Sequence, residues 1–336
     1  MAGERALTKF QWGLESTRGT AVAATRKVGA APKAIPADRV WEQVRLATGQ
    51  RAAVNAKRND ELLVKDTLTF DNAYFQALPG LFQCALDGAI SPAEVNVGQG
   101  DYKWDVAPSL TAANAPKSLT IEMGDDTQGY EVEFCQFERL VISGEMGQDG
   151  GASPVKIDAD YYGRQVTPTT FTNSLALPTG LEFINAKLAR LYLDTSWAGI
   201  GGTEKTGLLR GFSLEFLTGL HPKFMGSANK YFTTYGEGDL AVMLTLTLEG
   251  NSDADAIFDL YQAGTERALR LDMLGSQIGS GGVYTFRTDL YGYFEQVVPL
   301  SSEVNGNNLH QALFVMMPDS SGNFLDIDII TNDDEI

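Results

Sequence analysis

The stretch Tyr130-Glu-Val-Glu-Phe134 alternates large apolar and acidic side chains, and this alternation indicates the fold class. Successive side chains of a strand point to opposite faces, so the pattern predicts an antiparallel strand with one buried face. We expect this strand over residues 130–143, with further strands over 118–123 and 155–162. Turn-forming residues separate them, at 124–126 and at 147–151.

The second half of the chain follows the same pattern. Strands are expected over 186–194, 208–217, 240–248, 268–273, 283–298, 309–317 and 324–330. Apolar residues at three- and four-residue spacing predict a helix over 74–86, capped by Asp71-Asn72 and interrupted by Pro79. A short helix is expected over 254–262, capped by Asn251. The sequence therefore predicts a mainly β protein with two helices.

An internal repeat relates the two halves. Thr67-Leu-Thr-Phe before the first helix matches Thr245-Leu-Thr-Leu before the second. After the helices, Lys117-Ser-Leu-Thr-Ile-Glu-Met matches Arg267-Ala-Leu-Arg-Leu-Asp-Met, and long aromatic strands begin at Tyr130 and Tyr284. These last two matches are offset by 150 and 154 residues. A duplication is favoured, with related β-sandwich or barrel units over 60–180 and 181–336, each with a flanking helix. The alternative is that β-rich chains often repeat strand–helix–strand by construction.

Charge is unevenly distributed along the 336 residues, whose net charge is −17. Residues 1–59 carry 11 basic and four acidic residues, so their net charge is +7, and the other 277 residues carry −24. Because residues 13–59 also lack periodicity, we expect 1–59 to form an extended basic arm or loop. Such an arm can dock on the acidic body of a neighbouring copy, bind nucleic acid, or be a solvated terminus. The candidate docking residues are Arg18, Arg26, Lys27, Lys33, Arg39, Arg45 and Arg51.

Composition and motifs argue against several classes of protein. No run approaches the ~18 apolar residues of a membrane helix, and the start lacks a signal peptide. We therefore expect a cytosolic protein that does not associate with a membrane. Cys84 and Cys135 are too few for a disulfide framework. His221 and His310 lack partners for a metal or a catalytic triad.

One glycine-rich stretch has some features of a nucleotide site. Gly199-Ile-Gly-Gly-Thr-Glu-Lys-Thr206 resembles a phosphate-binding loop, but Glu204 stands where that loop has a glycine before the lysine. A carboxylate there would repel phosphate. We therefore expect no enzyme activity, no metal and no cofactor.

Three stretches resemble the tail tube (major tail) proteins of long-tailed bacteriophages: residues 12–25, Leu78-Pro-Gly-Leu81 and residues 163–172. The resemblance implies a β-sandwich or barrel core with a flanking helix. It also implies rings whose inner wall is a continuous β-barrel, stacked into a tube that carries DNA to the host. A duplicated chain would then form trimeric, pseudo-sixfold rings, whereas a chain without the repeat would form hexamers. The implied location is the virion tail, assembled in the host bacterial cytoplasm with other phage tail proteins.

An acidic wall fits such a conduit, because nonspecific affinity for double-stranded DNA requires cations. DNA would pass through the lumen without specific binding. The candidate lumen-facing acids are Glu131, Glu133, Glu138, Asp289 and Glu295, on the strands expected over 130–143 and 283–298. An ordinary solvent-facing surface is the alternative for these strands. Two other functions remain open: a carbohydrate- or receptor-binding β-sandwich module, which would expose clustered aromatic residues, and a hydrolase.

Overall fold

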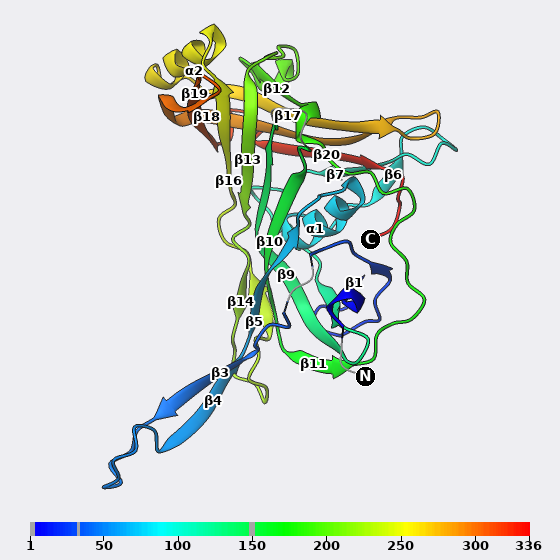
Figure 1. Cartoon of the computed structure of the whole chain (residues 1–336), viewed down its shortest axis with the longest axis vertical. Coiled ribbons are helices and arrows are strands. Elements are labelled where there is room, and N and C mark those ends of the chain that lie inside the picture. The colour runs from blue at the N-terminus through cyan, green and yellow to red at the C-terminus, as the bar shows by residue number, and fades with distance from the viewer. Residues whose placement is uncertain (1–3, 32–33, 148–151) are drawn as a thin grey trace.

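Long antiparallel strands dominate the computed structural model, which describes residues 4–31, 34–147 and 152–336 (Figure 1). The elements of the first half are β1 (Lys9–Leu14), β2 (Arg26–Lys27), β3 (Arg39–Val44), β4 (Ala56–Leu62), β5 (Val64–Phe70), α1 (Leu78–Ala85), β6 (Pro92–Glu94), β7 (Tyr102–Val106), β8 (Leu119–Gly124), β9 (Gly129–Glu145), β10 (Val155–Gly163) and β11 (Val166–Thr169). Those of the second half are β12 (Ala189–Asp194), β13 (Leu209–Leu217), β14 (His221–Lys223), β15 (Thr234–Gly236), β16 (Ala241–Glu249), α2 (Ser252–Gln262), β17 (Arg267–Gln277), β18 (Val283–Val304), β19 (Asn307–Met316) and β20 (Leu325–Thr331). Four short 3₁₀ helices are η1 (Arg5–Leu7), η2 (Phe75–Ala77), η3 (Ala186–Leu188) and η4 (Trp197–Gly199).

The predicted mainly β class with two helices is confirmed, and α2 begins as expected. The Asn251 side chain accepts hydrogen bonds from the amides of Asp253 and Ala254, at 3.0 and 3.1 Å. The expected cap of the first helix is wrong, because α1 begins only at Leu78, after the turn η2, and no side chain caps it. Pro79 lies in the first turn of α1, where its missing N–H leaves no hydrogen bond unmade.

Sixteen strands form three connected sheets, and β3–β4 and β14–β15 form two separate two-stranded sheets. The long sheet has the order β5-β10-β9-β13-β16-β19-β18, and the crossing sheet comprises β12-β17-β18-β20-β7-β6. The N-terminal sheet comprises β2-β1-β8-β9-β11. Figure 1 shows the strands of the crossing sheet passing over the upper ends of the long sheet. The connected sheets thus form a sandwich-like architecture.

Two long strands each belong to two sheets. The first part of β9, residues 129–135, pairs with β8 and β11, and its second part, residues 136–145, pairs with β10 and β13. In the same way, β18 pairs with β20 up to Leu290 and with β17 up to Gly292, and it pairs with β19 from Gly292 onward. Each strand therefore carries its side chains from one sheet into the next.

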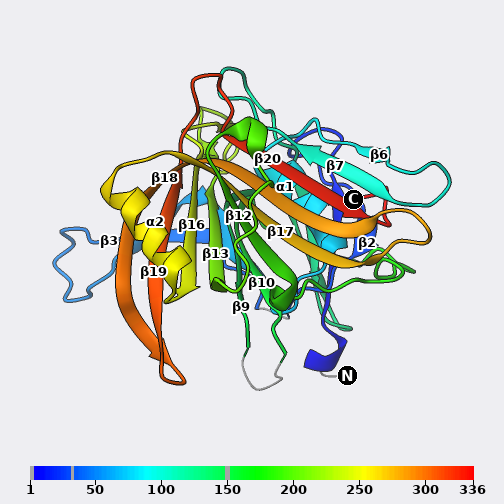
Figure 2. The same ribbon diagram turned by 90° about the horizontal axis from the view of Figure 1, so that it is seen from above.

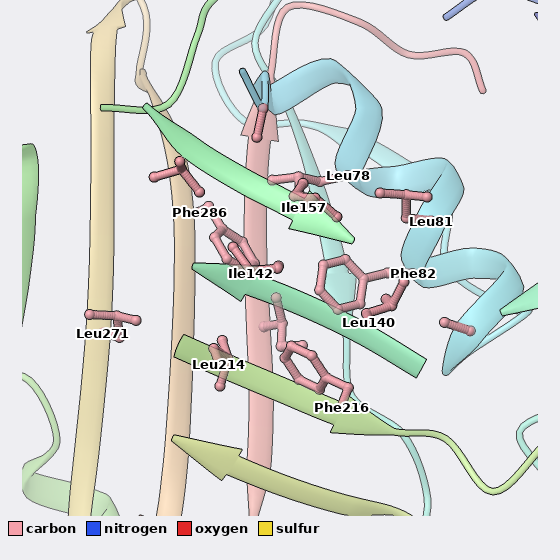
Figure 3. Close-up of a cluster of buried hydrophobic side chains, with 14 of the residues drawn as sticks. Leu78, Leu81, Phe82, Leu140, Ile142, Ile157, Leu214, Phe216, Leu271 and Phe286 are labelled. Atoms are coloured by element: carbon pink, nitrogen blue, oxygen red, sulfur yellow. The ribbon is translucent and has the colours of Figure 1, made fainter. Parts of the chain in front are cut away.

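Helix α1 lies between the sheets and is buried along its whole length. The ring of Phe82 packs 5.3 Å from that of Phe216 in β13 and 5.8 Å from that of Phe286 in β18 (Figure 3). The main cluster of buried apolar side chains includes residues from both halves. The halves therefore share one core, joined by the β9–β13 and β7–β20 pairs, and are not two separately packed units.

The order of strand pairing occurs twice. In the first half β5 pairs with β10, β10 with the second part of β9, and β8 with β1 and the first part of β9. In the second half the equivalent pairs are β16–β19, β19–β18, β17–β12 and β17–β18. Met123 opposes Tyr130 and Met273 opposes Phe286. Phe286, two residues beyond the predicted Tyr284, is therefore the equivalent of Tyr130.

The expected N-terminal arm differs most from the structure. Strand β1 pairs with β8, and Trp12 is 1% exposed within the core. The body therefore includes β1, and the hairpin of β3 and β4 is the part that projects from it (Figure 1). Strands β6 and β7 lie within residues 89–115, where we expected no strand. Among the described residues, no helix is long and apolar enough to cross a membrane.

Candidate assembly surfaces

The long sheet covers the core with one face and leaves much of the other face solvent-accessible. Along β16, Val242, Leu244 and Leu246 are buried, whereas Met243 and Thr245 are half-buried. We call this second side the open face, and it includes Thr67, Thr69, Arg139, Val141, Ser143, Asp158, Asp160, Ser213, Glu215, Met243, Thr245, Leu313 and Val315. One end of it forms a groove lined by Ser143, Lys156, Ser213 and Thr245.

Ion pairs offset much of the charge on the open face. Arg139 contacts Asp160 at 3.2 Å and also Glu215 on the neighbouring strand β13. The hydroxyl groups of Thr67 and Thr69 donate hydrogen bonds to Asp160 and Asp158, at 2.5 and 2.7 Å. The positive charge of Arg139 therefore lies between two carboxylates, which weakens its attraction for a phosphate backbone.

Two of the five predicted lumen-facing acids lie at equivalent positions of the long sheet. Glu138 and Glu295 are each the extra residue of a β-bulge, in β9 and in β18. The surrounding sequences, Phe137-Glu-Arg-Leu-Val141 and Phe294-Glu-Gln-Val-Val298, match each other. This short repeat is the sequence signal of the equivalence, and we did not predict it.

The environments of these two glutamates differ. The Lys65 ammonium lies 2.9 Å from the Glu138 carboxylate, so Glu138 has a cation on its own chain. Glu295 is exposed, and no ion pair joins it to another described residue.

The other three predicted acids lie outside the open face. Glu131 and Glu133 are in the first part of β9, within the N-terminal sheet, where burial raises the pKa of both. Asp289 is buried on the crossing sheet and binds Arg270 through two hydrogen bonds of 2.6 and 2.7 Å. The alternation of each strand correctly suggests two faces, but it does not show where the strand passes from one sheet to another.

Three of the predicted arm residues lie against the body. Arg18 donates hydrogen bonds to the carbonyl oxygens of Pro116 and Ala115, at 3.0 and 2.7 Å, and lies over the Tyr235 ring. Arg26 pairs with Asp333 at 2.7 Å, and the half-buried Lys27 follows it in β2. Contacts within the chain therefore use two of the cations, Arg18 and Arg26, that we expected to bind a neighbour.

The remaining arm residues belong to the projecting hairpin, apart from Lys33, which lies outside the described residues. Arg39, Arg45 and Arg51 are exposed on this hairpin, and so are the apolar side chains of Val40 and Trp41. The hairpin is therefore a basic and partly apolar projection.

Asp105, Asp326 and Asp328 form an acidic cluster whose oxygens lie within 4.8 Å of one another, as in a cation site. However, the Lys103 ammonium lies 2.6 Å from Asp328 and 3.4 Å from Asp105, and Arg287 is 3.6 Å from Asp328. These side-chain cations already offset the cluster, so we assign no metal to it. Burial, together with the charge of Asp328, raises the pKa of Asp326 to about 6.

The glycine-rich stretch 199–206 binds two carboxylates of its own chain. The Gly202 amide donates a hydrogen bond to Asp194 at 3.1 Å, and Lys205 pairs with Asp253 at 2.8 Å. These contacts occupy an amide and the lysine that a phosphate would need. Trp12 and Trp104 are buried, so at most two of the four tryptophans, Trp41 and Trp197, can contribute to an exposed sugar-binding platform.

No protein-family model matches the chain, and no curated protein matches it.

Proposed function

We propose that this chain is a structural virion protein that assembles into rings, and that the rings stack into a phage tail tube. The tube is an acidic conduit through which double-stranded DNA passes into the host without specific binding. The chain acts as a wall and not as an enzyme, and it needs neither a cofactor nor a metal. It resides in the virion tail, after assembly with other tail proteins in the host bacterial cytoplasm.

The repeated strand pairing within one continuous sheet carries this proposal. Strands β5, β10 and β9 form one half of the long sheet, and β16, β19 and β18 form the equivalent half, with β13 joining them. The chain therefore already joins two equivalent units edge to edge. Repeating this junction between copies would close a sheet around an axis and leave no strand edge unpaired.

The open face supplies the inner wall in this proposal. It carries Asp158, Asp160 and Glu215. Among its cations, Arg139 is flanked by two of these acids, and Lys156 lies in the groove at one end. A polyanion gains affinity by releasing counterions when it meets unpaired cations, so a wall of this kind binds DNA weakly. With two units per chain, three copies form a pseudo-sixfold ring.

Negative-stain electron microscopy of the purified full chain tests the proposal. We expect rings or hollow tubes, with threefold projections that show six similar lobes. Sixfold rings of six chains would overturn the trimeric arrangement, and compact monomers at all concentrations would overturn the function. Carbohydrate or receptor binding is the alternative, and retention of the monomer on a glycan array would favour it.

A further inference from the structure

One edge of the long sheet has no partner in the described chain. Up to Leu290, β18 pairs on both sides, with β17 and β20, but from Tyr293 to Val304 it pairs with β19 alone. Helix α2 packs beside β18, where Ile257 joins the core, so the helix covers a face of the strand (Figure 2). The unpaired N–H and C=O groups along this edge can pair with another strand.

The equivalent edge in the first half of the chain is occupied. The second part of β9 pairs with β10 on one side and with β13 on the other. Leu217, the last residue of β13, opposes Arg139, and the next residue, Thr218, donates its amide to the carbonyl of Glu138 at 3.1 Å. The β9–β13 pair is therefore a template for what the edge of β18 can accept.

The first half of the chain has a segment equivalent to β13, beside β5. The Leu63 amide donates to the carbonyl of Asp38 at 2.9 Å, four residues before Thr67. Leu217 likewise opposes Ala241, four residues before Thr245, the equivalent of Thr67. Asp38 thus corresponds to Leu217, and Arg39 corresponds to Thr218.

We propose that the β18 edge of one copy pairs with residues 34–38 of a second copy of this chain, in the register that β13 has on β9. This inference rests on the proposed function and identifies the junction between copies. The proposed partner is a second copy of this chain because residues 34–38, at the β5 end of the long sheet, are equivalent to β13. Strand β13 already pairs with the equivalent edge of β9.

Charge complementarity supports the same register. In the template, Thr218 meets the bulged Glu138, so Arg39 of the second copy would meet the equivalent bulged residue, Glu295. Glu138 pairs with Lys65, but the residue of β16 equivalent to Lys65 is the uncharged Met243. The Arg39 side chain is 59% exposed and is only 3.7 Å from Asp38, so it remains accessible to a neighbour. The junction would supply Glu295 with the cation that its own half lacks.

Disulfide trapping with the variant R39C/E295C tests the junction. In the β9–β13 template, the backbones of Thr218 and Glu138 lie within hydrogen-bonding distance. Cysteines at the equivalent residues, Arg39 and Glu295, would therefore be close enough for a disulfide. Both native cysteines are buried, so they should not contribute crosslinks. After oxidation of assembled protein we expect covalent dimers and trimers. The single variants R39C and E295C and the mispaired control R39C/S320C should give no ladder above background.

The outcomes separate the junction from the function. Rings or tubes whose R39C/E295C chains crosslink no better than the mispaired control would overturn the junction and leave the proposed function standing. A disulfide within one chain would also overturn it, because Arg39 lies beside β5, at one end of the long sheet, and Glu295 lies in β18, at the other end. If the unmodified protein does not assemble, both proposals are wrong.

A charge exchange at the same pair gives an independent measure. We expect R39E and E295R each to lower the fraction of assembled protein by about fivefold, and the double variant R39E/E295R to restore most of it. The control R5E, at an exposed arginine of η1 outside the hairpin, should leave the assembled fraction unchanged. Failure of the double variant to recover beyond the single variants would count against the Arg39–Glu295 contact.

Discussion

Asp326 on the crossing sheet illustrates how burial sets the charge of a single residue. Burial is the main cause of its raised pKa of about 6, and the neighbouring Asp328, Asp105 and Asp289 raise it further. The ordinary pKa of an aspartate is about 4, so the folded chain binds this proton more tightly than the unfolded chain. This contribution to the free energy of unfolding is therefore fully present below about pH 4 and is lost as the pH rises to about 6.

The variant D326N should remove this pH dependence. Burying an ionised carboxylate costs free energy, and an amide does not ionise. We therefore expect D326N to be about 1–2 kcal/mol more stable than the natural chain at pH 8, with a smaller difference at pH 4.5. Urea unfolding at both pH values measures this, and D126N on an exposed turn serves as the control. A D326N variant that is less stable at pH 8 would show that Asp326 accepts contacts which outweigh its burial.

Strand β1 shows that an element without a clear sequence pattern can belong to the core. Its pairing with β8 places Trp12 beneath the sheets, near Gly80 of α1. The Glu15 carboxylate, just beyond β1, accepts hydrogen bonds from the amides of Phe134 and Gly19, at 2.7 and 2.6 Å. These contacts attach the N-terminal segment to β9.

Two tryptophan variants distinguish a packed segment from a projecting one. We expect Trp12→Ala to lower the free energy of unfolding by about 3–5 kcal/mol, because it leaves a cavity in the core. Trp41→Ala, at a side chain 48% exposed on the hairpin, should change it by only about 0.5 kcal/mol. Urea denaturation measures both. Equal changes in the free energy of unfolding for the two variants would mean that residues 9–14 are not part of the folded body.

At the scale of the whole molecule, charge and projection offer a stacking contact for the proposed rings. The hairpin of β3 and β4 carries exposed Arg39, Arg45 and Arg51, whereas residues 60–336 carry a net charge of −24. A basic projection on an acidic body favours head-to-tail contact between copies, and such contact generates open filaments. The role expected for the whole arm therefore passes to this hairpin.

Replacing residues 45–55 by Asn-Gly shortens the hairpin with a turn suited to two paired strands. We expect the thermal midpoint to stay within about 4 °C, because the body loses no buried side chain. Rings should still form, but the tubes should be fewer and shorter in electron micrographs. The charge variant R45S/R51S separates the effect of charge from that of length. Tubes of unchanged length in the shortened variant would exclude the hairpin from stacking.

The sequence by itself determined the mainly β class, the approximate strand positions and the capped helix α2. These features depend on alternation and capping among neighbouring residues, which a single chain displays directly. The Thr67 and Thr245 motifs also proved equivalent, because they fill the same position in repeated strand pairs.

Only the tertiary structure decided which acids share a surface and which arm residues remain free. Glu138 and Glu295 lie in the long sheet, whereas Glu131 and Asp289, on the same two strands, lie in other sheets. Strand alternation repeats every two residues wherever a strand runs, so it does not record the residue at which β9 or β18 changes partners. That point depends on pairing between residues far apart in the chain, and the same long-range packing holds Trp12 in the core.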